Sequence, residues 1–182
     1  MAPFYTAEGD SGETGILGPG RISKASPRIE AVGTVDEAAA ALGLARSMAI
    51  HLETQRILLH IQRKLYQYMT EISSTQNTAN QFDLINTEDI NWLEEQIKSI
   101  EDQVDLPKDF IVSGSCPSSS TLSLARTIIR RAERRVIVLF ESKIIQKEIL
   151  IAYLNRLSSL IFVLEIFEIN QSGKSIELAK KE

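Results

Sequence analysis

The chain has 182 residues, of which 43% are hydrophobic and 24% are charged. A chain of this size and composition can bury a single core, which excludes a disordered segment or a peptide-sized scaffold. Twenty Lys and Arg residues against twenty-four Asp and Glu give a formal net charge of −4, whereas nucleic-acid binders carry a basic surface. The lone Cys116 excludes an internal disulfide, and one cysteine with two histidines does not supply a Cys/His zinc site.

The ends of the sequence indicate no targeting or membrane segment. The first ten residues contain neither a basic and apolar signal pattern nor an arginine-rich amphipathic one. The longest uncharged apolar stretch near the C-terminus, Leu157 to Leu164, is far shorter than the ~20 residues that span a bilayer. We therefore expect a cytoplasmic protein with neither a membrane nor a nucleic acid as partner.

The N-terminal segment, residues 1–26, is rich in glycine. Five of the nine glycines fall between Gly9 and Gly20, which predicts irregular backbone. Backbone N–H groups and hydroxyls in this segment could surround phosphate oxygens, and a flexible tail is the alternative interpretation. Residues 15–20 have the glycine spacing of a P-loop, but no Lys-Ser/Thr pair follows and no strand precedes them, so they are not a Walker A motif.

Apolar residues recur at three- and four-residue spacing through the rest of the chain and predict five helices. The first predicted helix covers residues 27–51, and the second carries the repeat from Leu58 to Ile72. A third runs from the capping residue Thr87 to about Gln103. The stretch 106–120 contains proline and glycine and is expected to be a structured connection.

The fourth and fifth predicted helices complete the domain. Their apolar repeats run from Leu122 to Leu139 and from Ile151 to Leu164. No strand alternation of comparable length competes with these periods, so the sequence predicts an all-α fold, an up-and-down helical bundle over residues 27–170 of a single domain.

The fourth predicted helix carries five arginines, with Glu133 alone against them: Arg126, Arg130, Arg131, Arg134 and Arg135. A solvated charged stripe is the simplest explanation of such a run. Arg126, however, directly follows the core position Ala125, so its guanidinium is expected at the core edge, where it needs an anionic partner such as a carboxylate or a triphosphate.

Other polar residues interrupt apolar faces. Asp36 and Glu37 lie on the alanine-rich first helix and are candidate partners for an arginine. Asn155, within the apolar fifth helix, indicates a hydrogen-bonding role because asparagine is a poor residue for a helix interior. His51 and His60 have no third ligand placed beside them, and we interpret both as non-ligands.

Four separated parts of the chain together resemble the PduO-type cobalamin adenosyltransferases. They occur in the family's order and cover nearly the whole chain: Thr6 to Thr14; Arg21 to Lys24 with Glu30 to Glu37; Phe110 to Gly114 with Leu122 to Arg134; and Tyr153 to Ser158. The Arg-Arg-Ala-Glu-Arg and Val-Asp-Glu segments in combination are specific, whereas the glycine loop alone is weak.

The resemblance implies a ferritin-like five-helix bundle that assembles as a homotrimer, with active sites between subunits. It implies transfer of the 5′-deoxyadenosyl group of ATP to the cobalt of cob(I)alamin, with release of triphosphate and with Mg²⁺ on the phosphates. Co(I) is itself the nucleophile in this reaction, so the protein must position substrates and stabilise charge. A cobalamin reductase and an adenosylcobalamin-dependent enzyme are the protein partners that it implies.

The resemblance also assigns site residues. It pairs Arg126 with Asp36 of a neighbouring subunit and places Phe110 under the lower face of the corrin ring, whereas residue type alone would put a phenylalanine in the core. The positions that match the family's ATP contacts are Thr6, Ala7, Glu8, Gly9, Thr14, Gly15, Lys24, Arg130, Arg131, Ala132, Glu133, Arg134 and Asn155.

The chain also differs from the family pattern. Ala7 replaces a usual glycine, and four differences lie on the corrin side, at Ser113, Ser115, Ser159 and Glu165. These differences leave room for a second hypothesis, a non-catalytic ATP-binding bundle that senses or delivers cobalamin. A nucleic-acid binder that uses the arginine face is disfavoured by the acidic net charge.

Overall fold

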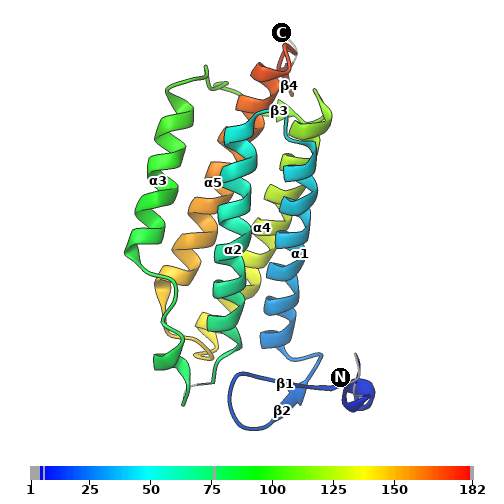
Figure 1. Ribbon diagram of the computed structural model, residues 1–182, viewed down its shortest axis with the longest axis vertical. Coiled ribbons are helices and arrows are strands. Elements are labelled where there is room, and N and C mark those ends of the chain that lie inside the picture. The colour runs from blue at the N-terminus through cyan, green and yellow to red at the C-terminus, as the bar shows by residue number, and fades with distance from the viewer. Residues whose placement is uncertain (1–4, 6, 76, 181–182) are drawn as a thin grey trace.

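The computed structural model describes residues 5, 7–75 and 77–180 (Figure 1). The described residues form an elongated bundle of five α-helices, which confirms the all-α prediction: α1 (Pro27–Met48), α2 (Leu52–Ser73), α3 (Thr87–Glu101), α4 (Pro117–Glu141) and α5 (Glu148–Gln171). Short elements lie at the bundle ends: the 3₁₀ helices η1 (Glu8–Ser11) and η2 (Ala79–Gln81) and the strands β1 (Glu13–Gly15), β2 (Arg21–Ser23), β3 (Ile111–Val112) and β4 (Glu177–Leu178).

Local chemistry fixes the helix starts. The Ser26 side chain caps α1 by accepting from the Ile29 backbone N–H, and Pro27 occupies the first turn, where no N–H is needed. The predicted cap of α3 was one residue off. Asn86, not Thr87, is the N-cap, and it forms a reciprocal capping box with Asp89.

Two predicted boundaries were wrong. The first helix ends at Met48 rather than at residue 51, because His51 already caps α2 by accepting from the Glu53 backbone N–H. Helix α4 begins at Pro117, inside the stretch predicted as a connection, because Cys116 and the side chain of Ser119 form a capping box.

The helices pack in a simple neighbour order. Helix α1 packs against α2 and α4, α4 against α5, and α5 against α3. Helix α5 is long and apolar enough to cross a membrane by length and composition alone, with a mean hydropathy of 1.7. In the structure, 61% of the most apolar 18-residue stretch of α5 is buried inside the bundle, as expected for a core helix.

Two small antiparallel ladders mark the two ends of the bundle (Figure 1). At one end β1 pairs with β2, with Thr14 opposite Ile22, and Leu17 bridges to Ser74 at the end of α2. At the other end β3 pairs with β4, so that the segment after α5 holds the connection between α3 and α4.

Candidate functional site

Residues 8–24, here called the N-terminal lobe, form a compact unit held by two cationic side chains. The Arg21 guanidinium donates to the carbonyls of Glu8 and Glu13 and pairs with the Glu8 carboxylate at 3.2 Å. Lys24 Nζ donates to the Gly9 carbonyl at 2.6 Å. Arg21 belongs to a segment that resembles the family, but its role in holding the lobe was not predicted, although an arginine directly after a glycine-rich turn is a usable signal.

Ala7 lies at the entrance of the lobe in the left-handed region, with φ of 58°. This conformation favours glycine, since a Cβ there costs roughly 1–2 kcal/mol. A glycine, which the family resemblance leads one to expect in place of Ala7, would adopt this backbone conformation without that cost. Thr6, which the sequence analysis placed among the ATP contacts, lies outside the described residues, whereas Thr14 and Gly15 lie in β1.

The arginines of α4 divide into two sets. Arg131 pairs with Glu37, and Arg135 pairs with Glu30 at 3.3 Å, both toward α1. The prediction that an acid of the first helix would partner an arginine is thus confirmed for Glu37. Within the described part of the chain, Arg130 and Arg134 form no ion pair, and both are exposed. These two exposed arginines are therefore available for an anion in solvent, whereas Arg126 lies at the core edge.

Asn155 and Glu133 join α5 to α4 beside these arginines. The Asn155 side-chain N–H donates to Glu133 Oε1 at 3.0 Å, which confirms the predicted hydrogen-bonding role of this mid-helix asparagine. Its backbone carbonyl accepts from the Ser158 hydroxyl at 2.9 Å and from that of Ser159 at 3.4 Å. The contact fixes the orientation of the Asn155 amide against Glu133, which directly precedes Arg134 in α4.

Phe110 lies at the opposite end of the bundle and is 88% exposed, so a core position is wrong for this residue. It borders a cavity of about 550 Å³, the Phe110 cavity, which Lys108, Arg126 and Phe162 also line. The Ala179 backbone N–H donates to the Phe110 carbonyl at 2.7 Å, extending the β3–β4 ladder. The loop therefore holds a large aromatic ring in solvent on a fixed backbone.

Arg126 lies at the core edge, as predicted from its place after Ala125. Its guanidinium carbon is 5.9 Å from the centroid of the Phe162 ring, a cation–π contact, and its Nε is buried without a hydrogen-bond partner. Asp36 is exposed on α1, and within the described residues no ion pair joins it to Arg126. Within the described part of one chain, neither side chain forms an ion pair with any residue.

The structure does not bring all predicted site residues together in one chain. The N-terminal lobe lies at one end of the bundle and the β3–β4 ladder beside Phe110 at the other (Figure 1). Helix α4 spans the distance between the two ends and carries Arg126, Arg130 and Arg134 along its length. The residues assigned to ATP and those assigned to the corrin ring form separate groups.

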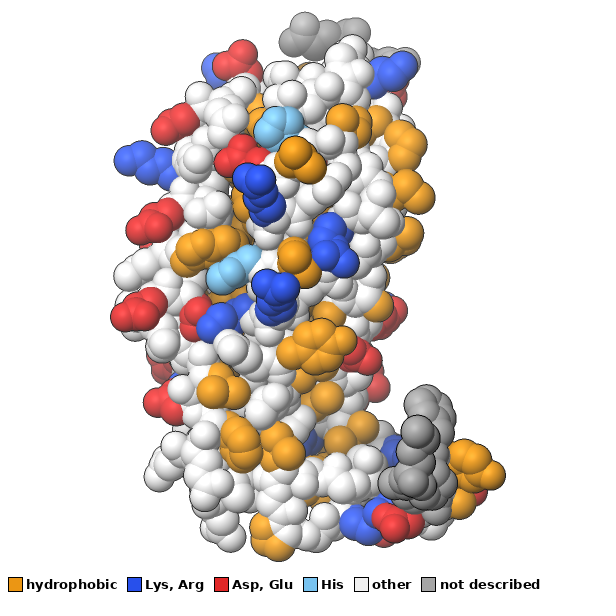
Figure 2. Space-filling model, viewed as in Figure 1, with side chains coloured by type: hydrophobic (Ala, Val, Ile, Leu, Met, Phe, Trp, Pro, Cys, Tyr) orange, Lys and Arg blue, Asp and Glu red, His pale blue; other side chains and the backbone are white. Residues whose placement is uncertain are grey.

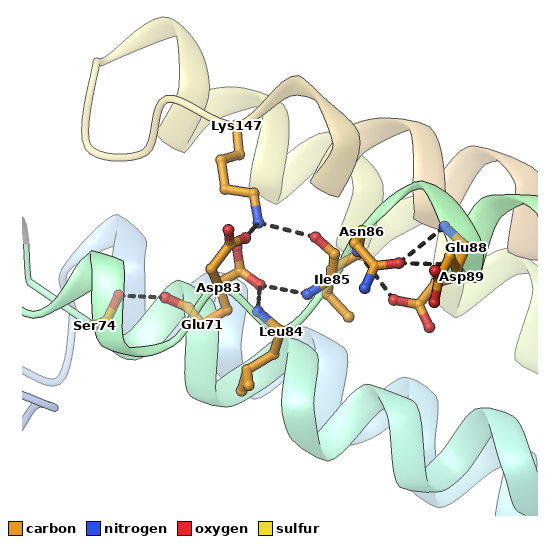
Figure 3. A network of polar contacts seen from close by, with 9 residues as sticks. All are labelled: Glu71, Ser74, Asp83, Leu84, Ile85, Asn86, Glu88, Asp89 and Lys147. Carbon is orange, nitrogen blue, oxygen red and sulfur yellow. Dashed lines mark hydrogen bonds and ion pairs between the residues drawn. The ribbon is translucent and has the colours of Figure 1, made fainter.

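A polar network at the end of α2 was not predicted from the sequence (Figure 3). The Glu71 carboxylate is buried and accepts from the backbone N–H groups of Leu84 and Ile85, at 3.0 and 2.9 Å, and from Lys147. Lys147 also donates to Asp83 and to the Ile85 carbonyl. Burial alone would lower the pKa of Lys147, but the hydrogen bonds to Asp83 and Glu71 outweigh it and raise the pKa.

Arg28 is a second missed residue at this end. It donates from α1 to the carbonyls of Ile72 and Ser74, which terminate α2, and to the Ile144 carbonyl at 3.3 Å. Burial lowers its pKa. Together with the Leu17–Ser74 bridge, these contacts attach the N-terminal lobe to a rigid platform.

The two histidines lie apart on the face viewed in Figure 2. His51 caps α2, and His60 stacks on Trp92 with ring centroids 4.1 Å apart. Burial, followed by the charge of Lys64, lowers the pKa of His60, although Asp89 acts in the opposite direction. Among the described residues, no group of three His, Cys, Asp or Glu side chains is arranged to hold a metal ion.

Comparison with known proteins gives a consistent family. The family model described as cobalamin adenosyltransferase matches residues 4–168. The corrinoid adenosyltransferase PduO of Salmonella typhimurium is 36% identical over 162 residues, which cover 88% of this chain and 48% of that protein. A corrinoid adenosyltransferase of Bacillus subtilis is 36% identical over 163 residues, covering 87% of this chain and 82% of the relative.

Solved structures agree with the sequence relatives. A phenylalanine-to-histidine variant of a PduO-type ATP:corrinoid adenosyltransferase from Lactobacillus reuteri, complexed with cobalamin and ATP, has a TM-score of 0.90 and 29% identity and covers 98% of this chain and 97% of its own. An arginine-to-lysine variant of the Lactobacillus reuteri enzyme, complexed with ATP, has a TM-score of 0.86. The chain spans about half the length of the Salmonella relative, whereas the match covers 88% of this chain. The chain belongs to the cobalamin adenosyltransferase family.

Proposed function

We propose that this chain transfers the 5′-deoxyadenosyl group of ATP to the cobalt of cob(I)alamin in the cytoplasm. The cobalt electron pair attacks C5′, a Co–C bond forms and the C5′–O bond breaks with its electrons on the departing triphosphate. Cobalt passes from Co(I) to Co(III), so no side-chain nucleophile is needed. The named relatives are corrinoid adenosyltransferases, and the phenylalanine-to-histidine variant of the Lactobacillus reuteri enzyme is complexed with cobalamin and ATP, which supports this assignment.

The observation that carries the proposal is Phe110, which is 88% exposed beside a cavity of about 550 Å³. The equally large Phe167 is completely buried. An exposed aromatic ring on a fixed loop suits a flat apolar ligand, because the ring and the ligand lose water together. Under the corrin ring it would exclude an axial cobalt ligand and make reduction to Co(I) easier.

The residues assigned to ATP would stabilise the negative charge that develops on the departing triphosphate. Arg130 and Arg134 are exposed and form no ion pair with the described residues, and the Lys24 amine donates to the Gly9 carbonyl within the N-terminal lobe. Guanidinium and ammonium groups stabilise a leaving triphosphate more strongly than they stabilise neutral ligands. A Mg²⁺ ion would be held mainly by phosphate oxygens and water, where it would neutralise part of the phosphate charge.

Assembly as a homotrimer is part of the proposal. Asp36 of one subunit would pair with Arg126 of the next, since within the described residues of one chain neither side chain forms an ion pair. The N-terminal lobe and the β3–β4 end beside Phe110 lie far apart within one bundle. An active site between subunits would allow the lobe of one subunit to lie near the Phe110 of another. A cobalamin reductase and an adenosylcobalamin-dependent enzyme would act before and after it.

Turnover tests the function directly. The protein is mixed anaerobically with MgATP and chemically reduced cobalamin, and the product is followed by its absorption spectrum before and after exposure to light. A light-sensitive Co–C product and stoichiometric triphosphate are expected. Binding of ATP and cobalamin with no product would instead support the non-catalytic sensor or carrier.

A further inference from the structure

Glu165 is the most unusual buried group in the bundle. It lies on α5 between Leu164 and Ile166 and is 1% exposed, and within the described residues neither carboxylate oxygen has a hydrogen bond of good geometry, although the Ser123 hydroxyl lies close enough to act on it. Carboxylates in protein interiors are normally paired, since an isolated buried charge is strongly unfavourable. The contrast is Glu168, one turn later and equally buried, which accepts from the backbone N–H groups of Ile50 and His51.

A matching unsatisfied donor lies on the neighbouring helix. Arg126 Nε on α4 is also buried without a hydrogen-bond partner. The positive charge of Arg126 acts on Glu165 and favours its ionised form, as does the hydroxyl of Ser123, also on α4. Burial outweighs both and raises the pKa of Glu165. Two neighbouring helices thus carry a buried acceptor and a buried donor of opposite charge that influence each other and are not hydrogen-bonded to each other.

The same cluster reaches the loop that bears Phe110. The Ser123 hydroxyl is 2.6 Å from the hydroxyl of Ser113, three residues after Phe110 and directly after β3. Arg126 itself lines the Phe110 cavity and contacts Phe162. Glu165 is therefore next to both polar side chains, Arg126 and Ser123, that support the wall of this cavity.

We propose that Glu165 is a positioning residue for Arg126. Its carboxylate accepts the Nε–H of Arg126 in the assembled protein and turns the four remaining guanidinium N–H groups toward the Phe110 cavity and the neighbouring subunit. The pair neutralises the guanidinium from inside the subunit. The cavity wall then keeps its shape without a net positive charge under the ligand.

The identity of the cavity's ligand in this inference rests on the proposed function, but the Glu165–Arg126 interaction is a property of the folded chain. It is tested first without any ligand, by a double-mutant cycle on thermal unfolding with Glu165→Gln, Arg126→Met and the double variant. Arg126→Met leaves a buried carboxylate with no cation. The double variant removes both charges and should be less destabilised than the sum of the single variants.

The pH dependence of thermal stability shows whether the ionised Glu165 carboxylate is the group that interacts with Arg126. A carboxyl group whose pKa is raised in the folded state contributes stability below its ordinary pKa and loses that contribution as the pH rises. Among the described residues, Arg126 on α4 is the charged group that acts on Glu165, and Ser123 on the same helix is the polar one. Arg126→Met should therefore lose several degrees of melting temperature between pH 5 and pH 8, and the double variant should not. If Arg126→Met does not fold, the double variant is expected to fold.

Steady-state kinetics give the readout that a merely structural residue would not change. Glu165→Gln should raise KM for cob(I)alamin several-fold with KM for ATP unchanged, because Arg126 lines the corrin-side cavity. Glu168→Gln is the matched control and should lower stability without changing either KM. Additive single variants, or a double variant as unstable or as unfolded as Arg126→Met, would overturn the positioning role. Coupling in a protein that shows no turnover would leave it standing and contradict the proposed function instead.

Discussion

Glu71→Gln tests the network that joins the end of α2 to the loops around it. Glu71 is 6% exposed, and its carboxylate accepts two backbone N–H groups and the Lys147 amine at once (Figure 3). Glutamine has nearly the same shape but only one acceptor oxygen. Whichever way its amide turns, an N–H group of the side chain faces either the ammonium or two backbone donors.

The size of the effect follows from these contacts. A hydrogen bond to a charged group contributes about 1.5–3 kcal/mol, and stranding one partner of a fully buried pair costs about 3–5 kcal/mol. The Lys147 side chain is 36% exposed and can be rehydrated, so the lower part of these ranges applies. We expect a loss of about 2–4 kcal/mol, equivalent to about 5–15 °C in melting temperature for a chain of this length.

The assay is thermal and urea unfolding followed by circular dichroism at one fixed protein concentration, because assembly also changes apparent stability. Asp83→Asn is the matched control. Asp83 pairs with the same lysine but its side chain is 70% exposed, so its loss should cost less than about 1 kcal/mol. A Glu71→Gln protein as stable as the control would show that the buried network does not hold this end together.

Four further outcomes are expected. Lys24→Ala should raise KM for ATP roughly tenfold or more by removing a charge-assisted contact, and an unchanged KM would remove Lys24 from the ATP site. Asp36→Ala should lose the trimer in sedimentation experiments together with turnover, and a fully active monomer would contradict the interface. Phe110→Ala should leave stability within about 0.5 kcal/mol because the ring is exposed, while the spectrum of bound Co(II)alamin shifts from four- toward five-coordinate. An unchanged spectrum in the folded variant would show that the ring does not control cobalt coordination. The raised pKa of Lys147 means that its contribution is complete below its ordinary value of 10.5 and is lost as the pH rises through the folded value, so the stability deficit of Lys147→Met should shrink in strongly alkaline solution.

The helices could be predicted because a helix buries one face at fixed spacing. Leu58, Ile61, Leu65 and Tyr68, whose period predicted α2, are all completely buried. The position of Arg126 at the core edge followed from the same geometry. These inferences need only the sequence within one helix.

Residues whose surroundings come from distant segments could not be predicted in this way. Glu71 follows the helical period as an ordinary polar residue, and its burial depends on Lys147, 76 positions away. Glu165 was noted only as a difference from the expected family pattern. Its burial and its lack of a well-formed hydrogen bond depend on the packing of α5 against α4, which the sequence of one helix does not give. Phe110 is exposed because β3 and β4 fix its loop, which a rule based on residue type does not include.

The arrangement of one bundle argues for a composite site. Helix α4 has 25 residues and is therefore about 37 Å long, and the N-terminal lobe and Phe110 lie near its opposite ends. The proposed adenosyl transfer would require C5′ and cobalt at bonding distance, so ATP would lie along α4, with its phosphates toward the lobe and Arg134 and its ribose toward Phe110. Asp36 and Arg126 lie on the neighbouring helices α1 and α4, and among the described residues neither forms an ion pair. A neighbouring copy that pairs with both charges would close the open side of this path and exclude water from the reacting atoms.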